Sequence, residues 1–291
     1  RAAAIKHGAA TIALKVAEMA EDTESSMLLA FLDSLTPTGD KNLPSQELID
    51  ACHSIQETKR TSDGKKDPRF IIPVVTGMKR VDLVKKLPEF VAVSDKIFMA
   101  ALVNMASRLA RHALVYREEP EGVTTTTADN NNNNNSSTAP VLTGMTLCEQ
   151  LVFLHKMDFA AEGIPQKRYL DAIRLCLEDE EVFTDTVVQE ALDYMSGTFL
   201  TEEDVNLPLA YMRTIILTCS KHESLHNWIC HILLPRLIDG KVYTDRRQWE
   251  GWMRCARMLE NTKVEGVREA IDKLPEEQYE LYRTKYPETK R

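Results

Sequence analysis

The most regular hydrophobic pattern in the chain lies between residues 205 and 259, where apolar residues recur every three or four positions. This spacing gathers apolar side chains on one side of an α-helix, and here it predicts three consecutive amphipathic helices. The first helix is predicted to bury Leu209, Met212, Ile216 and Cys219. The second is predicted to bury Leu225, Trp228, Ile229, Ile232 and Leu233, and the third Trp249, Trp252, Met253, Ala256 and Leu259. Amphipathic helices joined by short turns are typical of an α-solenoid or an irregular helical stack.

Shorter helices are predicted on the N-terminal side of this stretch. An Ala-rich helix interrupted by Gly8 opens the chain, and a second helix covers about residues 25–35. A third is expected to begin at about Pro44. Asp67 can cap a helix whose first position is Pro68, because proline has no amide proton to leave unpaired there.

Further helices are predicted between Ser94 and Gly197. Ser94 caps a helix that extends to about Tyr116, and Pro165 and Thr184 each start another. The positions expected to be buried are Phe98, Leu102, Met105, Leu109, Tyr169, Ile173, Cys176, Leu177, Val188, Ala191, Leu192 and Met195. Helix pairs therefore recur at roughly 35–45 residues, which is the range of HEAT-like repeats.

Residues 118–140 interrupt the helical pattern with a polar tract, EEPEGVTTTTADNNNNNNSSTAP. It has almost no apolar surface whose burial could offset the conformational entropy lost on ordering. We therefore predict a disordered insertion within an all-α, HEAT-like or irregular helical stack. Residues 1–66 are predicted to form an N-terminal helical segment. Residues 67–117 and 141–291 are predicted to be two parts of one helical domain, with the insertion over residues 118–140 between them.

Composition limits the classes of function. The chain has 291 residues, of which 36 are Lys or Arg and 44 are Asp or Glu, giving a formal net charge of −8. This balance disfavours binding of nucleic acid over the whole surface, because such binding depends on neutralising phosphates. The six cysteines form no CxxC pair, as expected in a reducing compartment. No apolar run approaches the roughly 20 residues that span a bilayer, and the arginine at position 1 suggests a fragment of a longer protein.

One motif suggests catalysis. Residues 222–226, HESLH, match H-E-x-x-H, in which two histidines bind zinc and the glutamate activates water. Glu250 or Cys230 could supply a third ligand. However, Ser220 and Glu223 also have the spacing of a capping box, which would engage the glutamate with the backbone. We favour a chance match, and expect no catalytic residue, no metal and no cofactor.

A second set of residues suggests partner binding. Arg213, Tyr243, Trp249 and Trp252 are candidate interface residues, because tryptophan, tyrosine and arginine dominate interface hot spots. The competing interpretation places both indoles in the core between helices, and their i, i+3 spacing favours it. For Arg213 the equally favoured alternative is an internal ion pair between stacked helices. His155, close to an apolar stripe, is expected to be a hydrogen-bonded core histidine.

Several ordered segments resemble one known family. They are DPRFIIPVVTGMKRVDLVKKLPEFV, LTGMTLCEQLVFLHKMD, CLEDEEVFTDTVV, NLPLAYMRTII, HILLPRLIDGKVYTDRRQWEGWMRC and EAIDKLPEEQYELY. Together they resemble the C-terminal region of the symplekin family, over roughly Pro68 to Tyr286. The order of the segments, rather than any single motif, carries the resemblance.

The resemblance implies a non-catalytic scaffold of the nuclear machinery that cleaves and polyadenylates pre-mRNA. The implied partners are the C-terminal domains of the processing endonuclease and of its inactive paralogue, together with an RNA-binding cleavage-stimulation subunit. Neither strong direct nucleic-acid binding nor membrane association is expected. The alternatives are a zinc hydrolase using the H-E-x-x-H motif and an RNA-binding helical-repeat protein.

Overall fold

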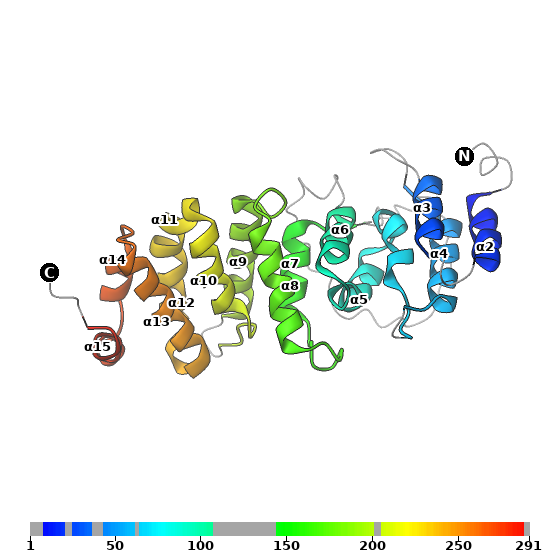
Figure 1. Ribbon diagram of the computed structural model, residues 1–291. Helices are drawn as coiled ribbons and strands as arrows, with labels where there is room; N and C mark the ends of the chain where they lie inside the picture. Colours follow the sequence, from blue (N-terminus) through cyan, green and yellow to red (C-terminus); the bar gives the residue numbers. More distant parts are fainter. Residues whose placement is uncertain are drawn as a thin grey trace, which may run out of the picture. The chain divides into compact units, whose positions relative to one another are not determined.

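The computed structural model describes residues 8–20, 25–36, 43–61, 64–106, 144–200 and 205–287. Regular structure in this part of the chain is helical, and its only β-pairing is two isolated bridges (Figure 1). The predicted all-α helical stack is therefore confirmed. The predicted insertion over residues 118–140 and the far end of the helix expected to reach Tyr116 lie outside the described residues.

The chain divides into two compact units. Unit 1 comprises Arg1–Leu83 and Asn104–Thr146, and unit 2 comprises Val84–Val103 and Leu147–Arg291. The elements of unit 1 are α2 (Ala9–Met19), α3 (Ser25–Leu35), α4 (Gln46–Thr58) and the 3-10 helices η2 (Pro68–Phe70) and η3 (Ile72–Gly77). None of the described helices in either unit is long and apolar enough to cross a bilayer.

Local signals set the helix starts of unit 1. Gly8 precedes α2 with a φ of 81°, a conformation that glycine adopts without strain, so the helix begins after it. Ser45 caps α4, whose first residue follows Pro44 by two positions. The Asp67 side chain accepts a hydrogen bond from the Arg69 backbone amide at 3.1 Å, with Pro68 in the first turn. The predicted cap at Asp67 is confirmed.

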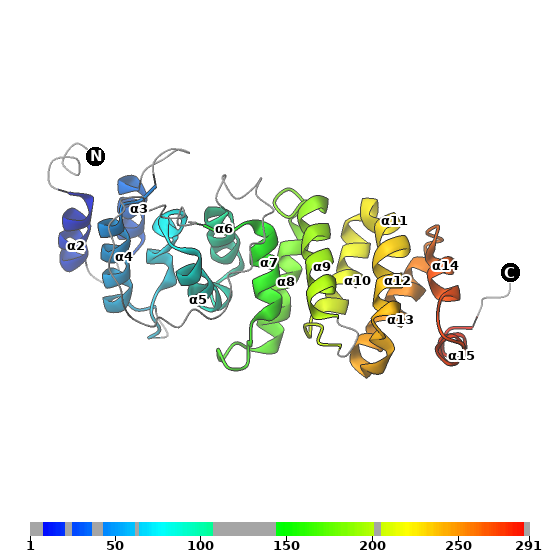
Figure 2. The same ribbon diagram turned by 180° about the vertical axis from the view of Figure 1, so that it is seen from behind.

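Unit 2 contains a series of antiparallel and crossing helices (Figures 1 and 2). Most of α5 (Arg80–Val91) and α6 (Asp95–Met105) belongs to it. The later elements are α7 (Leu147–Lys156), α8 (Gln166–Glu178), α9 (Asp185–Phe199), α10 (Tyr211–Lys221), η5 (Glu223–Leu225), α11 (His226–Trp228), η6 (Ile229–Leu233), α12 (Leu234–Asp239), η7 (Val242–Thr244), α13 (Arg246–Asn261), α14 (Val267–Asp272) and α15 (Glu276–Lys285).

Two layers run through this series. In one layer α7 packs against α9, and Arg236 of α12 donates to Asp193 of α9 at 2.7 Å. In the other layer α8 packs against α10, and α10 packs against α13. Alternate helices therefore stack on each other, which is the arrangement expected of HEAT-like helix pairs.

Arg168 of α8 fixes the end of α5 within this unit. Its guanidinium donates to the backbone oxygens of Val91 and Val93, each at 2.6 Å, and pairs with the Asp95 carboxylate. The last carbonyls of a helix have no partner within the helix, so a cation there satisfies them and opposes the helix dipole.

The first predicted stripe of the central region is partly wrong. Met212 and Cys219 are buried as expected, but Leu209 is 45% exposed and Ile216 is only half-buried. The helix begins at Tyr211, after a turn at Pro208, so Leu209 precedes it. The buried residues of α10 are Tyr211, Met212, Thr214, Ile215, Thr218 and Cys219.

The second predicted helix is not a single α-helix. It consists of η5, α11, the π-helical segment η6 and α12, and Ile232 in η6 is 45% exposed. Pro235 is the second residue of α12 and lacks the amide proton for an i to i−4 hydrogen bond, so a widened turn before it avoids the clash. The extra residue in that turn rotates Ile232 away from the core.

The third predicted helix is confirmed, because all five residues of its stripe are buried in α13. One face of α13 lies close to α10 at Gly251. A Cβ built on Gly251 would lie 2.9 Å from Met212 Cγ and closer still to Met212 Cβ. The two helices therefore approach each other through a position where only glycine fits.

Candidate protein-interaction surface

Three of the four predicted interface residues lie in one row of aromatic rings. The ring centroids of Tyr243 and Trp249 are 6.4 Å apart, and those of Trp249 and Trp252 are 5.2 Å apart and stacked. Tyr282 of α15 lies 6.3 Å from Trp252, and Tyr286 lies 5.5 Å from Tyr282. We call these five residues the aromatic row. It joins η7, α13 and α15.

Within the row, the two indoles belong to the core. Trp252 is fully buried and donates its Nε1–H to the backbone oxygen of Leu234 at 3.2 Å. Trp249 is 7% exposed. Tyr243 and Tyr286, at the two ends of the row, are half-buried and reach the surface. Any partner that touches the row in this conformation meets its ends rather than its indoles.

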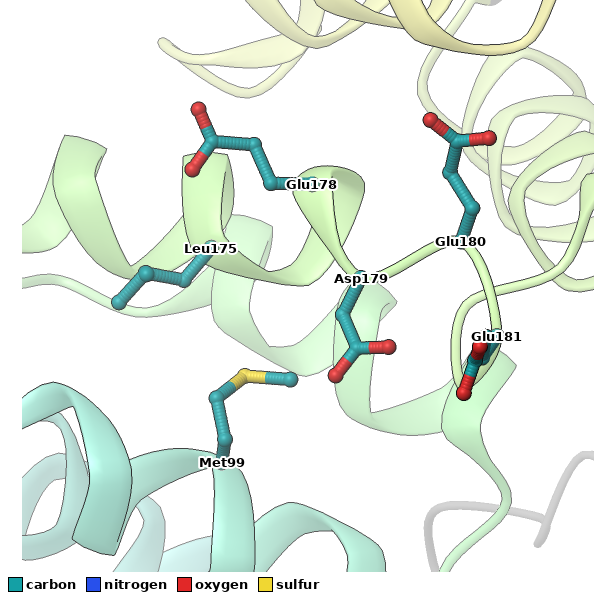
Figure 3. A pocket seen from close by; sticks show the side chains of 6 residues that line it. All are labelled: Met99, Leu175, Glu178, Asp179, Glu180 and Glu181. Atoms are coloured by element: carbon teal, nitrogen blue, oxygen red, sulfur yellow. The ribbon is translucent and has the colours of Figure 1, made fainter.

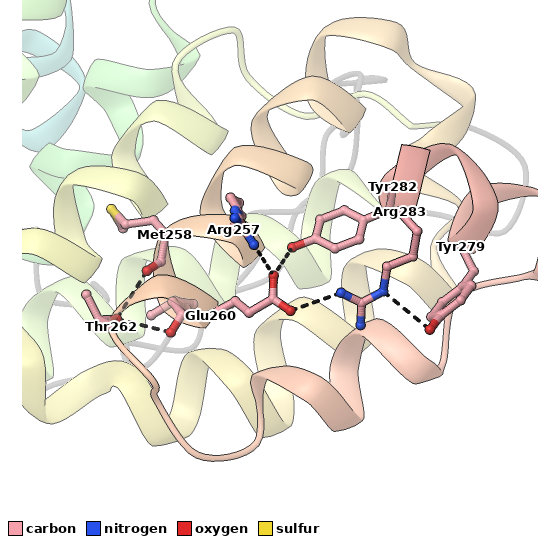
Figure 4. Close-up of polar contacts among 8 residues, drawn as sticks. Arg257, Met258, Glu260, Thr262, Tyr279, Tyr282 and Arg283 are labelled. Atoms are coloured by element: carbon pink, nitrogen blue, oxygen red, sulfur yellow. Dashed lines mark hydrogen bonds and ion pairs between the residues drawn. The ribbon is translucent and has the colours of Figure 1, made fainter. Parts of the chain in front are cut away.

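Glu260 of α13 attaches α15 beside the row (Figure 4). Its carboxylate accepts hydrogen bonds from Arg257 at 3.0 Å, from Arg283 at 3.0 Å and from the Tyr282 hydroxyl at 3.2 Å. Burial by itself would raise the pKa of Glu260, but the hydrogen bonds from Arg283 and Arg257 outweigh it and the pKa is lowered. The Tyr282 ring is buried, and this burial raises its pKa.

Arg213 lies apart from the aromatic row, on the exposed side of α10. It adjoins Met212, the residue that meets Gly251 of α13. Arg247 and Arg254 stand four residues before and three residues after Gly251, and both are exposed. These two arginines were not among the residues predicted to contact a partner. Their spacing around Gly251 in a predicted amphipathic helix is the sequence signal that could have identified them.

The H-E-x-x-H residues do not share one α-helical turn. His222 follows the last residue of α10, and its Nδ1 lies 2.6 Å from Asp185 Oδ1. His226 begins α11, and its Nε2 lies 2.7 Å from the Cys219 backbone oxygen. The 3-10 helix η5 separates them, whereas a zinc-binding H-E-x-x-H projects both imidazoles from one α-helix. Among the described residues, no group of three or more His, Cys, Asp or Glu is arranged to hold a metal ion.

His155 is a core histidine, as predicted. Its Nδ1 lies 2.7 Å from the Leu151 backbone oxygen, and its Nε2 lies 2.7 Å from Thr214 Oγ1. Burial lowers the pKa of His155 to about 4. The imidazole is therefore neutral at physiological pH and joins α7 to α10.

The six cysteines are free and buried. Cys219 and Cys255 lie 3.7 Å apart at the packing of α10 against α13. The hydrogen bond with Cys219 and burial raise the pKa of the Cys255 thiol, and burial raises that of Cys230 to about 12. Buried thiols with raised pKa values are poor nucleophiles, so Cys230 and Cys255 serve packing.

A shallow hollow of ≈ 480 Å³ lies between α6 and α8 in unit 2 (Figure 3). Met99 and Leu175 form its apolar part, and the consecutive residues Glu178, Asp179, Glu180 and Glu181 form its acidic part. The Asp179 carboxylate accepts a hydrogen bond from the Val182 amide at 3.2 Å, so it stabilises the turn. The other three residues are exposed, and the Glu178 carboxylate pairs with Arg174 at 2.9 Å.

Comparison with known proteins identifies one family. The family model described as "Symplekin tight junction protein C terminal" matches residues 67–286. This range covers most of the described part of unit 2 and the 3-10 helices of unit 1. No solved structure matches the chain.

Proposed function

Since the chain belongs to the symplekin family, we propose that it is a non-catalytic scaffold subunit of the nuclear machinery that cleaves and polyadenylates pre-mRNA. Symplekin-family proteins are scaffolds of mRNA 3′-end processing. The family match is the observation that carries the proposal. It agrees with the all-α helical stack, in which the buried His155 joins two helices and the buried cysteines pack between helices.

We propose that the chain holds other processing subunits through the outer faces of its helices. The partners are the C-terminal domains of the processing endonuclease and of its inactive paralogue, and an RNA-binding cleavage-stimulation subunit. Preformed helical faces lose little entropy on binding, which favours association without rearrangement. Arg213 and Tyr243 are the proposed contact residues, because both side chains reach the surface, whereas Trp249 and Trp252 are buried.

Co-purification with defined partners tests this proposal. The chain would be co-expressed with the tagged C-terminal domains of the endonuclease and its paralogue, and separately with the cleavage-stimulation subunit. We expect a stable complex with at least one of these partners. The double variant R213A/Y243A should retain less partner than wild type, whereas Lys167→Ala, at an exposed position of α8, should retain as much. Failure of wild-type chain to retain any of the three partners would refute the proposal.

A further inference from the structure

The arginines of unit 2 fall into two groups. Arg168, Arg174, Arg236, Arg257 and Arg283 each form an ion pair with an aspartate or glutamate of the same unit. Arg213, Arg246, Arg247, Arg254 and Arg268 are exposed, and no acidic side chain in the described part of the chain pairs with them. In a chain with a net charge of −8, four of these five arginines lie on two adjoining helices, Arg213 on α10 and Arg246, Arg247 and Arg254 on α13.

The packing of α10 against α13 brings Arg213, Arg247 and Arg254 to one surface. Arg247, Gly251, Arg254 and Met258 follow at i, i+4, i+7 and i+11, so they form a single stripe along α13. Gly251 marks the side of that stripe that touches Met212 of α10. The arginines of α13 therefore border α10, and Arg213 extends from the exposed side of α10 next to the contact.

The neighbouring acidic residue does not neutralise this surface. Glu250 lies between Arg247 and Arg254 in sequence, but its carboxylate lies 3.8 Å from Lys285 Nζ of α15. Glu250 is therefore directed to the side of α13 opposite α10. Asp245 accepts hydrogen bonds from the backbone amides of Arg247 and Gln248, at 2.8 and 2.9 Å, which caps α13.

Apolar side chains accompany the arginines. Ile216 and Leu217 on α10 and Met258 on α13 are each half-buried, so part of each side chain is available at the surface. The outward sides of α10 and α13 carry no aromatic ring on which a nucleic-acid base could stack within the described residues. A guanidinium group binds a carboxylate through two parallel hydrogen bonds. The half-buried side chains of Ile216, Leu217 and Met258 can contact aliphatic residues that stand next to such carboxylates in a partner segment.

We propose that Arg213, Arg247 and Arg254 form a docking surface for a partner segment in which Asp or Glu residues alternate with aliphatic residues. The segment would lie along α10 and α13, with its carboxylates on the guanidinium groups and its aliphatic side chains over Ile216 and Met258. This inference rests on the proposed scaffold function and specifies the chemical class of one partner segment, an acidic and aliphatic one.

Fluorescence anisotropy with a defined probe tests the surface. The probe is a labelled 12-residue peptide in which Glu and Asp alternate with Val and Leu, titrated with the full chain at low and physiological salt. We expect saturable binding that the triple variant R213E/R247E/R254E weakens at least tenfold. The charge-matched triple variant K167E/R268E/K273E, at exposed positions of α8 and around α14, should bind within about twofold of wild type.

Three outcomes would overturn the proposal. They are no saturable binding of the acidic peptide, an equal loss in the control triple variant, or tighter binding of a labelled poly(U) RNA of matched charge. If circular dichroism shows that the triple variant is unfolded, R254Q and R247Q are measured individually, and each should weaken binding severalfold. The co-purification with processing subunits does not use this peptide. Failure of the peptide to bind would therefore refute the docking surface without refuting the proposed scaffold function.

Discussion

Gly251 gives the sharpest test of the packing between α10 and α13. In an exposed helix interior, replacing glycine by alanine stabilises by roughly 0.5–1 kcal/mol, because it reduces the conformational freedom of the unfolded chain. At Gly251 the added Cβ would lie 2.9 Å from Met212 Cγ and closer to Met212 Cβ. Carbon atoms in favourable contact are about 3.5–4.0 Å apart, so the two helices would have to separate.

The magnitude follows from these opposing effects. Overpacking a filled core costs about 1–3 kcal/mol. The cost here lies at the upper end, because Met212 Cβ is fixed to the backbone and no rotamer change can move it. After subtraction of the helix-propensity gain, we expect Gly251→Ala to lower the free energy of unfolding by about 2 kcal/mol. For a domain of this size, that corresponds to a fall in Tm of about 4–8 °C.

Gly197 supplies a matched control in the same unit. It also lies inside a helix, α9, but a Cβ built on it meets no atom within 4 Å. We expect Gly197→Ala to raise the free energy of unfolding by roughly 0.5–1 kcal/mol. Urea denaturation followed by circular dichroism measures both variants, and the two substitutions should change stability with opposite signs.

A double-mutant cycle identifies the atom responsible. Met212→Gly removes the Cβ that Gly251→Ala would meet, whereas Met212→Ala leaves it in place. The cycle with Met212→Gly should therefore show a favourable coupling energy between the two positions, and the cycle with Met212→Ala a much smaller one. A Gly251→Ala variant as stable as wild type would refute the close approach of α10 and α13, and with it the placement of the three arginines on one surface.

Two further predictions concern buried polar groups of unit 2. The pKa of His155 is about 4 when folded against 6.5 for the free side chain, so the unfolded state binds the extra proton between these values and stability falls as the pH falls from 6.5 towards 4. The stability advantage of wild type over His155→Gln should shrink by about 2 kcal/mol between pH 7 and pH 5 in urea titrations, at 1.36 kcal/mol per pH unit below 6.5, and a constant difference would contradict the neutral buried imidazole. Arg168→Ala removes the donors to the last carbonyls of α5 and should lower the free energy of unfolding by about 1.5–3 kcal/mol. Arg174→Ala, on the same helix but with exposed ion pairs to Asp171 and Glu178, should cost less than about 1 kcal/mol, and equal losses would show that the bonds of Arg168 add nothing.

The sequence by itself determined the helices and most of their buried sides. The start of α3, the cap at Asp67 and the stripe of α13 were all predicted, because each depends on residues within a few positions of one another. Backbone sterics, capping and helical periodicity act over that range. The all-α class and the family resemblance follow from the same local patterns taken in order.

Only the tertiary structure decided which helix each side chain meets. The stripe of α10 was misplaced at Leu209, because the turn at Pro208 delays the start of the helix and the packing with α8 and α13 selects its inward side. The widened turn before Pro235 turned Ile232 outward in the same way.

The candidate surface depends on such long-range contacts even more. Periodicity favoured a buried position for Trp252, which the structure has, but it could not show whether the exposed Arg213 is paired within the chain. Whether an arginine is paired depends on carboxylates that are distant in sequence and become neighbours only when the helices pack. The sequence therefore specified most of the helices, and the packing of those helices decided which arginines are paired and which remain unpaired at the surface.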